Sequence, residues 1–107
     1  VDDHCRGIAI VCAKGEPGQS YNIGGGLELN NREITERVLD AMGADWSSVK
    51  QVEDRKGHDR RYSVDDSRLR AMGYAPQHTF DDGLAETVAW YKNNEAWWRP
   101  LKAKAAL

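Results

Sequence analysis

The chain has 107 residues, enough for one domain that buries about two thirds of its unfolded surface. Its composition is that of a soluble globular protein, with 40% hydrophobic residues, 30% charged residues and a formal net charge of −2. This slightly acidic balance argues against a nucleic-acid-binding protein, and no apolar run approaches the ~18 residues that would predict a membrane span.

The first predicted element is a helix that begins near Asp2 or Asp3, either of which can cap it. Its buried stripe is predicted from four residues at helical spacing: Cys5, Ile8, Ala9 and Cys12. The two cysteines lie seven residues apart, so their Cα atoms are about 10 Å apart on a helix, too far for a disulfide. We therefore expect reduced thiols in the core of a cytoplasmic protein.

A turn at 15–18 leads to a short extended segment at 20–23, which ends in three consecutive glycines. The spacing of these glycines matches no nucleotide-binding fingerprint, so a sharp turn at the end of a strand is the better interpretation.

The second predicted helix starts at Asn30 or Asn31, and Asn30 can form a capping box with Glu33. Gly43 is expected to end this helix in the left-handed conformation. The residues predicted to form its buried stripe are Ile34, Val38, Ala41 and Met42.

Further along, strands are predicted at 49–53 and 62–64, the second followed by a brief helix between Asp66 and Gly73. A connector marked by Pro76 then leads to the last clear helix, which starts after Thr79. The apolar positions of that helix are Phe80, Leu84, Val88 and Tyr91. Residues 101–107 are expected to be a frayed tail.

The segment from Asp54 to Tyr62 concentrates four cations, two carboxylates, one imidazole and one phenol in nine residues. Arginine can fork two hydrogen bonds onto phosphate oxygens, and lysine adds a point charge, so the composition suits an anionic ligand. The alternative is a solvated, charge-rich surface loop. The run has no helical or alternating period and follows a predicted strand, and both features favour a ligand-binding loop.

This nine-residue run, Asp-Arg-Lys-Gly-His-Asp-Arg-Arg-Tyr, closely resembles the Asp-Arg-Pro-Gly-His-Asp-Arg-Arg-Tyr signature of dTDP-glucose 4,6-dehydratases. Lys56 stands where proline is common. Three weaker matches to the same family occur in the same order, and together they extend the resemblance over nearly the whole chain: Val1–His4, Tyr21–Gly25 and Gly83–Tyr91.

The resemblance implies an α/β fold, namely the small C-terminal substrate-binding lobe of an extended short-chain dehydrogenase, covering residues 1–100 with 101–107 as a tail. The Rossmann domain of that family is expected to be absent, since the chain has no Gly-x-x-Gly-x-x-Gly fingerprint and no Tyr-x-x-x-Lys pair. We therefore assign no catalytic and no cofactor-binding residue here. The NAD that the parent enzyme requires would be held outside this chain.

By the same resemblance, five residues of the run match positions that contact the nucleotide diphosphate of the substrate: Asp54, Arg55, Lys56, Gly57 and His58. Asn31 matches a further polar contact, with a plain helix N-cap as the alternative. His58 could instead only brace the loop by hydrogen bonding. No histidine or cysteine has a partner at metal-ligand spacing, so we expect no metal site.

The implied activity of the parent protein is NAD-dependent removal of water from dTDP-glucose to give a 4-keto-6-deoxy sugar, without turnover by this chain alone. A lone lobe would expose the surface that meets the missing Rossmann domain, so self-association or exchange of elements is expected. Three alternatives stay open. They are another nucleotide-sugar epimerase or dehydratase, a non-catalytic anion- or nucleotide-binding module, and an accessory protein whose aromatic C-terminal region binds a partner.

Overall fold

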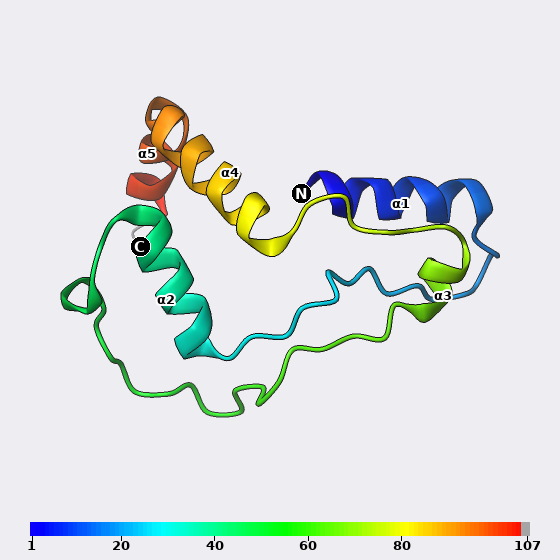
Figure 1. The fold of residues 1–107 in the computed structure, drawn as a ribbon, viewed down its shortest axis with the longest axis horizontal. Coiled ribbons are helices and arrows are strands. Elements are labelled where there is room, and N and C mark those ends of the chain that lie inside the picture. The colour runs from blue at the N-terminus through cyan, green and yellow to red at the C-terminus, as the bar shows by residue number, and fades with distance from the viewer. Residues whose placement is uncertain (106–107) are drawn as a thin grey trace. The chain divides into compact units, whose positions relative to one another are not determined.

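A computed structural model describes residues 1–105 of the chain, and within this part every regular element is a helix (Figure 1). The chain falls into two compact units, each built from two separate stretches of sequence. The first unit combines residues 1–28 with 51–79, and the second combines residues 29–50 with the chain from Phe80 onward.

The first unit contains α1 (Asp2–Lys14) and the short α3 (Ser67–Ala71), which pack against each other. Its core is small and centres on Leu69, which is fully buried, and Tyr74, which is 5% exposed. Gly7 is buried where α1 meets the extended chain, because a Cβ at this position would lie 2.7 Å from the Cγ2 atom of Ile23. The absence of a side chain at Gly7 is therefore what lets the helix approach so closely.

Asp3 ties the start of α1 to the connector that follows α3. Its carboxylate accepts hydrogen bonds from the backbone N–H groups of Gln77 at 2.9 Å and His78 at 3.2 Å, and it pairs with Arg6. These donors, the Gln77 amide first, lower the pKa of Asp3. The prediction that Asp2 or Asp3 caps α1 is wrong, because the helix already starts at Asp2 with Val1 as its N-cap residue.

The second unit contains α2 (Asn31–Met42), the 3₁₀ turn η1 (Trp46–Ser48), α4 (Phe80–Asn93) and α5 (Glu95–Lys104). Helix α4 packs against both α2 and α5. The side chain of Arg37 on α2 reaches α4, where it pairs with Asp81 at 2.6 Å and lies over the ring of Phe80. Between α4 and α5, the indole Nε1 of Trp98 donates to the carbonyl of Tyr91 at 2.8 Å.

Local signals at the ends of α2 predicted its bounds correctly. Asn30 and Glu33 form the expected capping box, each side chain accepting from the other's backbone N–H. Gly43 ends the helix in the left-handed region with φ of 67°. The tail predicted at 101–107 is helical as far as Lys104, since α5 continues to that residue, and residues 106–107 lie outside the described part.

The structure corrects the prediction of strands. Residues 20–23, 49–53 and 62–64 contain no strand, so the α/β class is wrong for the described chain, which is helical with long extended connections. A strand exists only when a second strand accepts and donates its backbone hydrogen bonds, which the sequence of one segment cannot guarantee.

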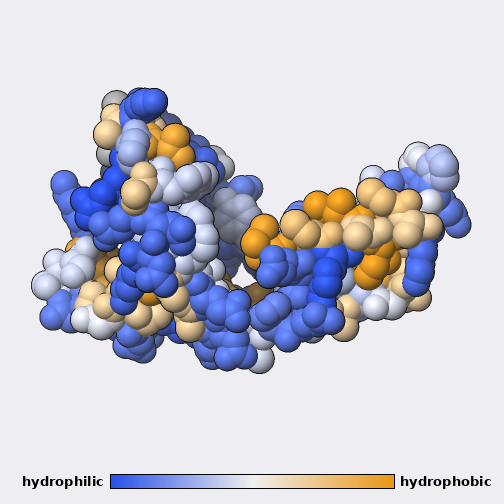
Figure 2. Space-filling model, turned by 90° about the horizontal axis from the view of Figure 1, so that it is seen from above, coloured by the Kyte–Doolittle hydropathy of each residue, from blue (hydrophilic) through white to orange (hydrophobic). Residues whose placement is uncertain are grey.

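The buried stripes predicted for α1 and α2 are also wrong. Both cysteines are free thiols but exposed, and Ile8 between them is 46% exposed. Figure 2 shows apolar side chains gathered along α1 on its solvent face. On α2 the buried residue is Leu39, which is 8% exposed, whereas Met42 of the predicted stripe is 49% exposed. An apolar stripe marks a face that can be buried; on α1 the buried residue, Gly7, lies opposite the stripe, and on α2 the buried residue, Leu39, lies beside it.

Candidate anion-binding site

A tight turn lies at the centre of the charged run. The backbone N–H of His58 donates to the carbonyl of Arg55 at 3.1 Å, and Gly57 has a positive φ of 72°. A turn with this hydrogen bond and a left-handed glycine in its third position fits type II. Lys56 occupies the second position, where proline is favoured, and this accounts for the proline common in the resembling signature. Every residue from 51 to 65 is exposed.

Asp54 and His58 face each other across the turn. The imidazole Nδ1 lies 3.4 Å from a carboxylate oxygen of Asp54, and the ring meets Tyr62 edge-on with centroids 6.4 Å apart. His58 therefore contacts both flanks of the loop, which supports the bracing role that the sequence left open for it. Its side chain is 37% exposed, so it is also accessible to a ligand.

The four cations of the run divide into two groups. The guanidinium of Arg61 is engaged, since Nε and Nη2 donate to the two carboxylate oxygens of Glu28 at 2.7 and 2.8 Å. Glu28 also accepts a hydrogen bond from the Ser63 hydroxyl at 2.5 Å. The hydrogen bonds from Arg61 first, and from Ser63 second, lower the pKa of Glu28 to about 2, and the pairing raises the pKa of Arg61.

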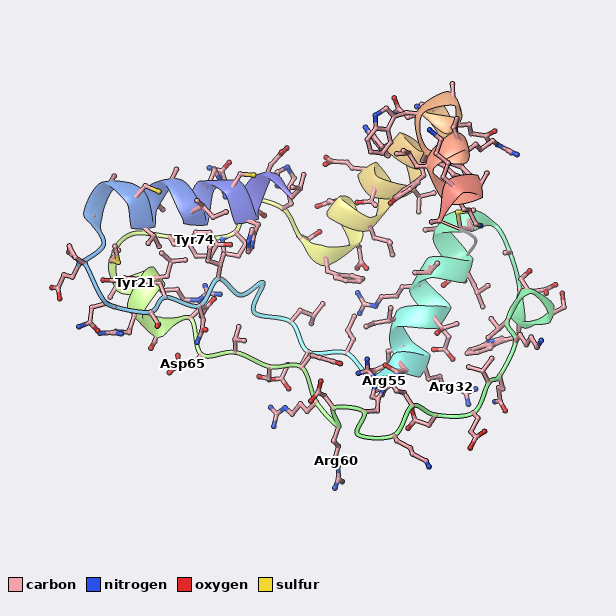
Figure 3. All side chains as sticks on the ribbon, turned by 180° about the vertical axis from the view of Figure 1, so that it is seen from behind. Tyr21, Arg32, Arg55, Arg60, Asp65 and Tyr74 are labelled. Carbon is pink, nitrogen blue, oxygen red and sulfur yellow. The ribbon has the colours of Figure 1, made fainter. Side chains whose placement is uncertain are left out.

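The other three cations, Arg55, Lys56 and Arg60, have no side-chain hydrogen bond or ion pair with any residue of the described chain. In Figure 3 the side chain of Arg60 extends away from the ribbon. Three uncommitted positive charges within six residues make this turn a suitable place for a phosphate or another multivalent anion.

Asn31 belongs to the second unit and is the first residue of α2. Asn30 caps the helix, so the N-cap alternative for Asn31 is wrong. The backbone carbonyl of Asn31 accepts the Thr35 hydroxyl at 2.7 Å, and its exposed side chain makes no hydrogen bond within the described chain. The residue is thus available for a ligand at the helix N-terminus, where backbone N–H groups favour an anion.

The described residues offer neither a metal site nor a dinucleotide site. Within residues 1–105 no group of three His, Cys, Asp or Glu side chains could hold a metal ion, and no helix is both long and apolar enough to cross a membrane. Gly24–Gly26 do not open a helix, because α2 begins only at Asn31. These glycines therefore do not fit the phosphate-binding turn of a dinucleotide site.

Glu28 was not predicted from the sequence; it joins the charged run to the segment that precedes α2. Its partner Arg61 is 33 residues away along the chain. The signal in the sequence was only a lone acidic residue after the glycine turn, and nothing in its local pattern points to a distant arginine.

No family model matches the sequence, but the sequence is similar to known proteins. The dTDP-glucose 4,6-dehydratase of Streptomyces griseus is 55% identical over 108 residues, which cover all of this chain and 33% of the relative. That of Streptomyces antibioticus is 50% identical over 107 residues, covering 99% of this chain and 32% of the relative.

A solved structure gives the same family as these sequence matches. DesIV of Streptomyces venezuelae, a dTDP-glucose 4,6-dehydratase crystallised with NAD and TYD bound, superposes with a TM-score of 0.88 at 63% identity. The superposition covers 94% of this chain and 32% of DesIV. The chain matches the C-terminal part of dTDP-glucose 4,6-dehydratases. It spans about a third of the length of the dehydratases that it matches.

The match to dTDP-glucose 4,6-dehydratases confirms the resemblance drawn from the charged run. It also bears on the fold, because the helical arrangement of this chain is found in the corresponding third of a solved dehydratase.

Proposed function

We propose that this chain is the substrate-binding part of a dTDP-glucose 4,6-dehydratase, and that its charged turn binds the diphosphate of dTDP-glucose. The observation that carries the proposal is the set of uncommitted cations, Arg55, Lys56 and Arg60, around a glycine-centred turn. The dehydratase names of its relatives support it, as does DesIV, which was solved with NAD and TYD bound.

Each residue of the turn has a distinct task in this proposal. Arg55 donates two parallel hydrogen bonds to phosphate oxygens, and Lys56 adds a point charge. Gly57 supplies the positive φ that folds the turn. Asp54 orients His58, whose imidazole contacts the nucleotide. For Asn31, in the second unit, the resemblance supports a separate polar contact with the substrate.

The complete reaction would be NAD-dependent dehydration of dTDP-glucose to a 4-keto-6-deoxy sugar in the cytoplasm. NAD would be held by a Rossmann domain outside these 107 residues, since no dinucleotide fingerprint occurs in them. Nothing in this chain is assigned to the chemical steps, so we expect no turnover by the chain alone. Product formation from NAD and dTDP-glucose by the isolated chain would contradict this.

The exposed apolar face of α1 is proposed to pack against the rest of the enzyme. Cys5, Ile8 and Cys12 share this face and are exposed, although side chains of this kind are usually buried. The dehydratases are about three times as long as this chain, so they contain enough further structure to cover it. Without that cover the chain should self-associate or exchange elements, and light scattering over a range of concentrations would detect either.

The experiment that tests the binding role is neutralisation of Arg55 in the complete enzyme that contains this sequence. Loss of a charge-assisted contact costs about 1.5–3 kcal/mol, so Arg55→Gln should raise the Kd for dTDP roughly 10- to 150-fold in isothermal titration calorimetry.

Arg99→Gln is the matched control, because Arg99 is an exposed arginine of α5 whose interactions, an ion pair with Glu95 and a contact with the ring of Trp98, are local to that helix. It should leave the Kd unchanged. An unchanged Kd for Arg55→Gln would refute the proposed function. Equal affinity of the unaltered enzyme for dTDP and UDP would leave the diphosphate role intact but favour another nucleotide-sugar enzyme.

A further inference from the structure

Two extended segments of the first unit, residues 22–28 and 61–65, run antiparallel. They form no ladder of backbone hydrogen bonds, and side-chain hydrogen bonds join them instead. Asn22 Nδ2 donates to the carbonyl of Asp65 at 2.9 Å, and six residues beyond Asn22 the carboxylate of Glu28 binds Arg61 and Ser63. The crossing partners fall in reverse order along the two segments, and Figure 1 shows the segments side by side.

Glu28 is the point at which the charged turn is anchored. Between residues 54 and 60 the hydrogen bonds, ion pairs and ring contacts of the described chain are internal to the loop: the Arg55–His58 hydrogen bond, the Asp54–His58 pair and the His58–Tyr62 ring contact. Arg61 is the first residue after the turn whose side chain reaches a different segment. The orientation of the turn relative to the rest of the first unit therefore depends on Arg61 and its carboxylate partner.

We propose that Glu28 is a positioning residue that fixes Arg61 and thereby presents the 55–58 turn to the substrate diphosphate, so that Arg61 itself is not a phosphate ligand. This inference rests on the proposed function of the turn. A loop that is already ordered before binding loses less conformational entropy when the ligand arrives, and its affinity is higher for that reason.

The geometry favours this role for Arg61 over direct phosphate binding. Both donors of one guanidinium edge, Nε and Nη2, are engaged by the two oxygens of Glu28, so the edge that would fork onto a phosphate is occupied. Ser63 adds a third hydrogen bond to the same carboxylate, and the low pKa keeps Glu28 charged at neutral pH. To bind phosphate through this edge, Arg61 would first have to break two hydrogen bonds.

The test uses dTDP binding and steady-state kinetics of the complete enzyme with Glu28→Gln, Arg61→Met and the double variant. The pair is exposed, with side-chain exposures of 49% and 70%, so its energetic value is modest. Each single variant should raise the Kd for dTDP and the KM for dTDP-glucose roughly two- to fivefold with kcat unchanged. The double variant should be no worse than either single variant, since both remove one interaction.

Asp45→Asn is the matched control. Asp45 is an exposed carboxylate with a lowered pKa, and within residues 1–105 its side chain accepts hydrogen bonds only from Ser47, two residues away, so its neutralisation should leave the Kd unchanged. Arg61→Lys, which keeps the charge but loses the forked geometry, replaces Arg61→Met if that variant unfolds. It should weaken binding to a similar extent.

Three results would overturn the inference. Unchanged binding in both single variants would show that the anchor does not matter. A tenfold or larger loss in Arg61→Met with no loss in Glu28→Gln would make Arg61 a direct ligand, and additive losses in the double variant would mean separate roles. If Arg55→Gln weakens binding while these variants do not, only this inference fails and the proposed function stands.

Discussion

Replacing Gly7 by alanine tests whether the close approach of α1 to the extended chain is what holds the first unit together. The new Cβ would lie 2.7 Å from Cγ2, 3.1 Å from Cδ1 and 3.3 Å from Cγ1 of Ile23. Cγ2 is attached directly to the β-carbon of a β-branched residue, so it cannot swing away without a change of χ1 or of the backbone. The two segments must therefore separate slightly.

The expected magnitude is the difference between two opposing effects. Overpacking in a well-packed site costs about 1–3 kcal/mol. Alanine in the middle of a helix gains about 1 kcal/mol over glycine, and Gly7 lies in the interior of α1. The net result for Gly7→Ala is a loss of about 0–2 kcal/mol in the free energy of unfolding.

Gly83→Ala provides a matched control in α4. A Cβ at Gly83 would meet nothing within 4 Å, and the residue does not have a positive φ, so only the helix-propensity gain applies. It should stabilise the protein by about 0.5–1 kcal/mol. Urea unfolding followed by far-ultraviolet circular dichroism measures both variants. Stabilisation of Gly7→Ala by as much as Gly83→Ala would refute the packing argument, whereas truncation of Ile23 to alanine should remove the clash in Gly7→Ala.

Two further predictions concern the turn and the pH dependence of the first unit. Lys56→Pro places proline at the favoured second position of the turn and should stabilise the loop by about 0.4–1 kcal/mol. The expected result is slower proteolysis within the charged run. Faster cleavage would contradict a type II turn. Asp3→Asn should lower the thermal midpoint at neutral pH. Because the pKa of Asp3 is lowered in the folded state, the stability from its carboxylate is present above the ordinary value of 3.8 and is lost as the pH falls below it. The difference in thermal midpoint between Asp3→Asn and the original protein should therefore shrink at pH values below 3.8, and a difference that persists unchanged well below that value would contradict the role of the Asp3 charge.

The helix ends were predictable from the sequence, because their signals act over three or four residues. Asn30 and Glu33 form their capping box within one turn, and Gly43 adopts the left-handed conformation that only its local backbone requires. The glycine-centred turn of the charged run was predictable for the same reason, since Gly57 bends the backbone wherever the loop lies.

The predictions that failed concern features that depend on contacts between distant parts of the chain. The apolar stripe of α1 predicted a buried face but could not show that Gly7, on the other side, is the residue that packs inside the unit. The strands predicted at 49–53 and 62–64 did not form, because a strand needs a partner that the pattern cannot supply. The pair of Glu28 and Arg61 joins residues 33 positions apart, and nothing near either residue predicts the other.

The interleaved construction of the first unit has a consequence for biosynthesis. Helix α1 leaves the ribosome before α3, which packs against it, because the intervening residues 29–50, which belong to the other unit, are made between them. During synthesis α1 therefore stays with its packing surface uncovered until α3 is made, and a chaperone can bind it in that interval. Slow codons placed between residues 29 and 50 would prolong that wait and should lower the yield of folded protein.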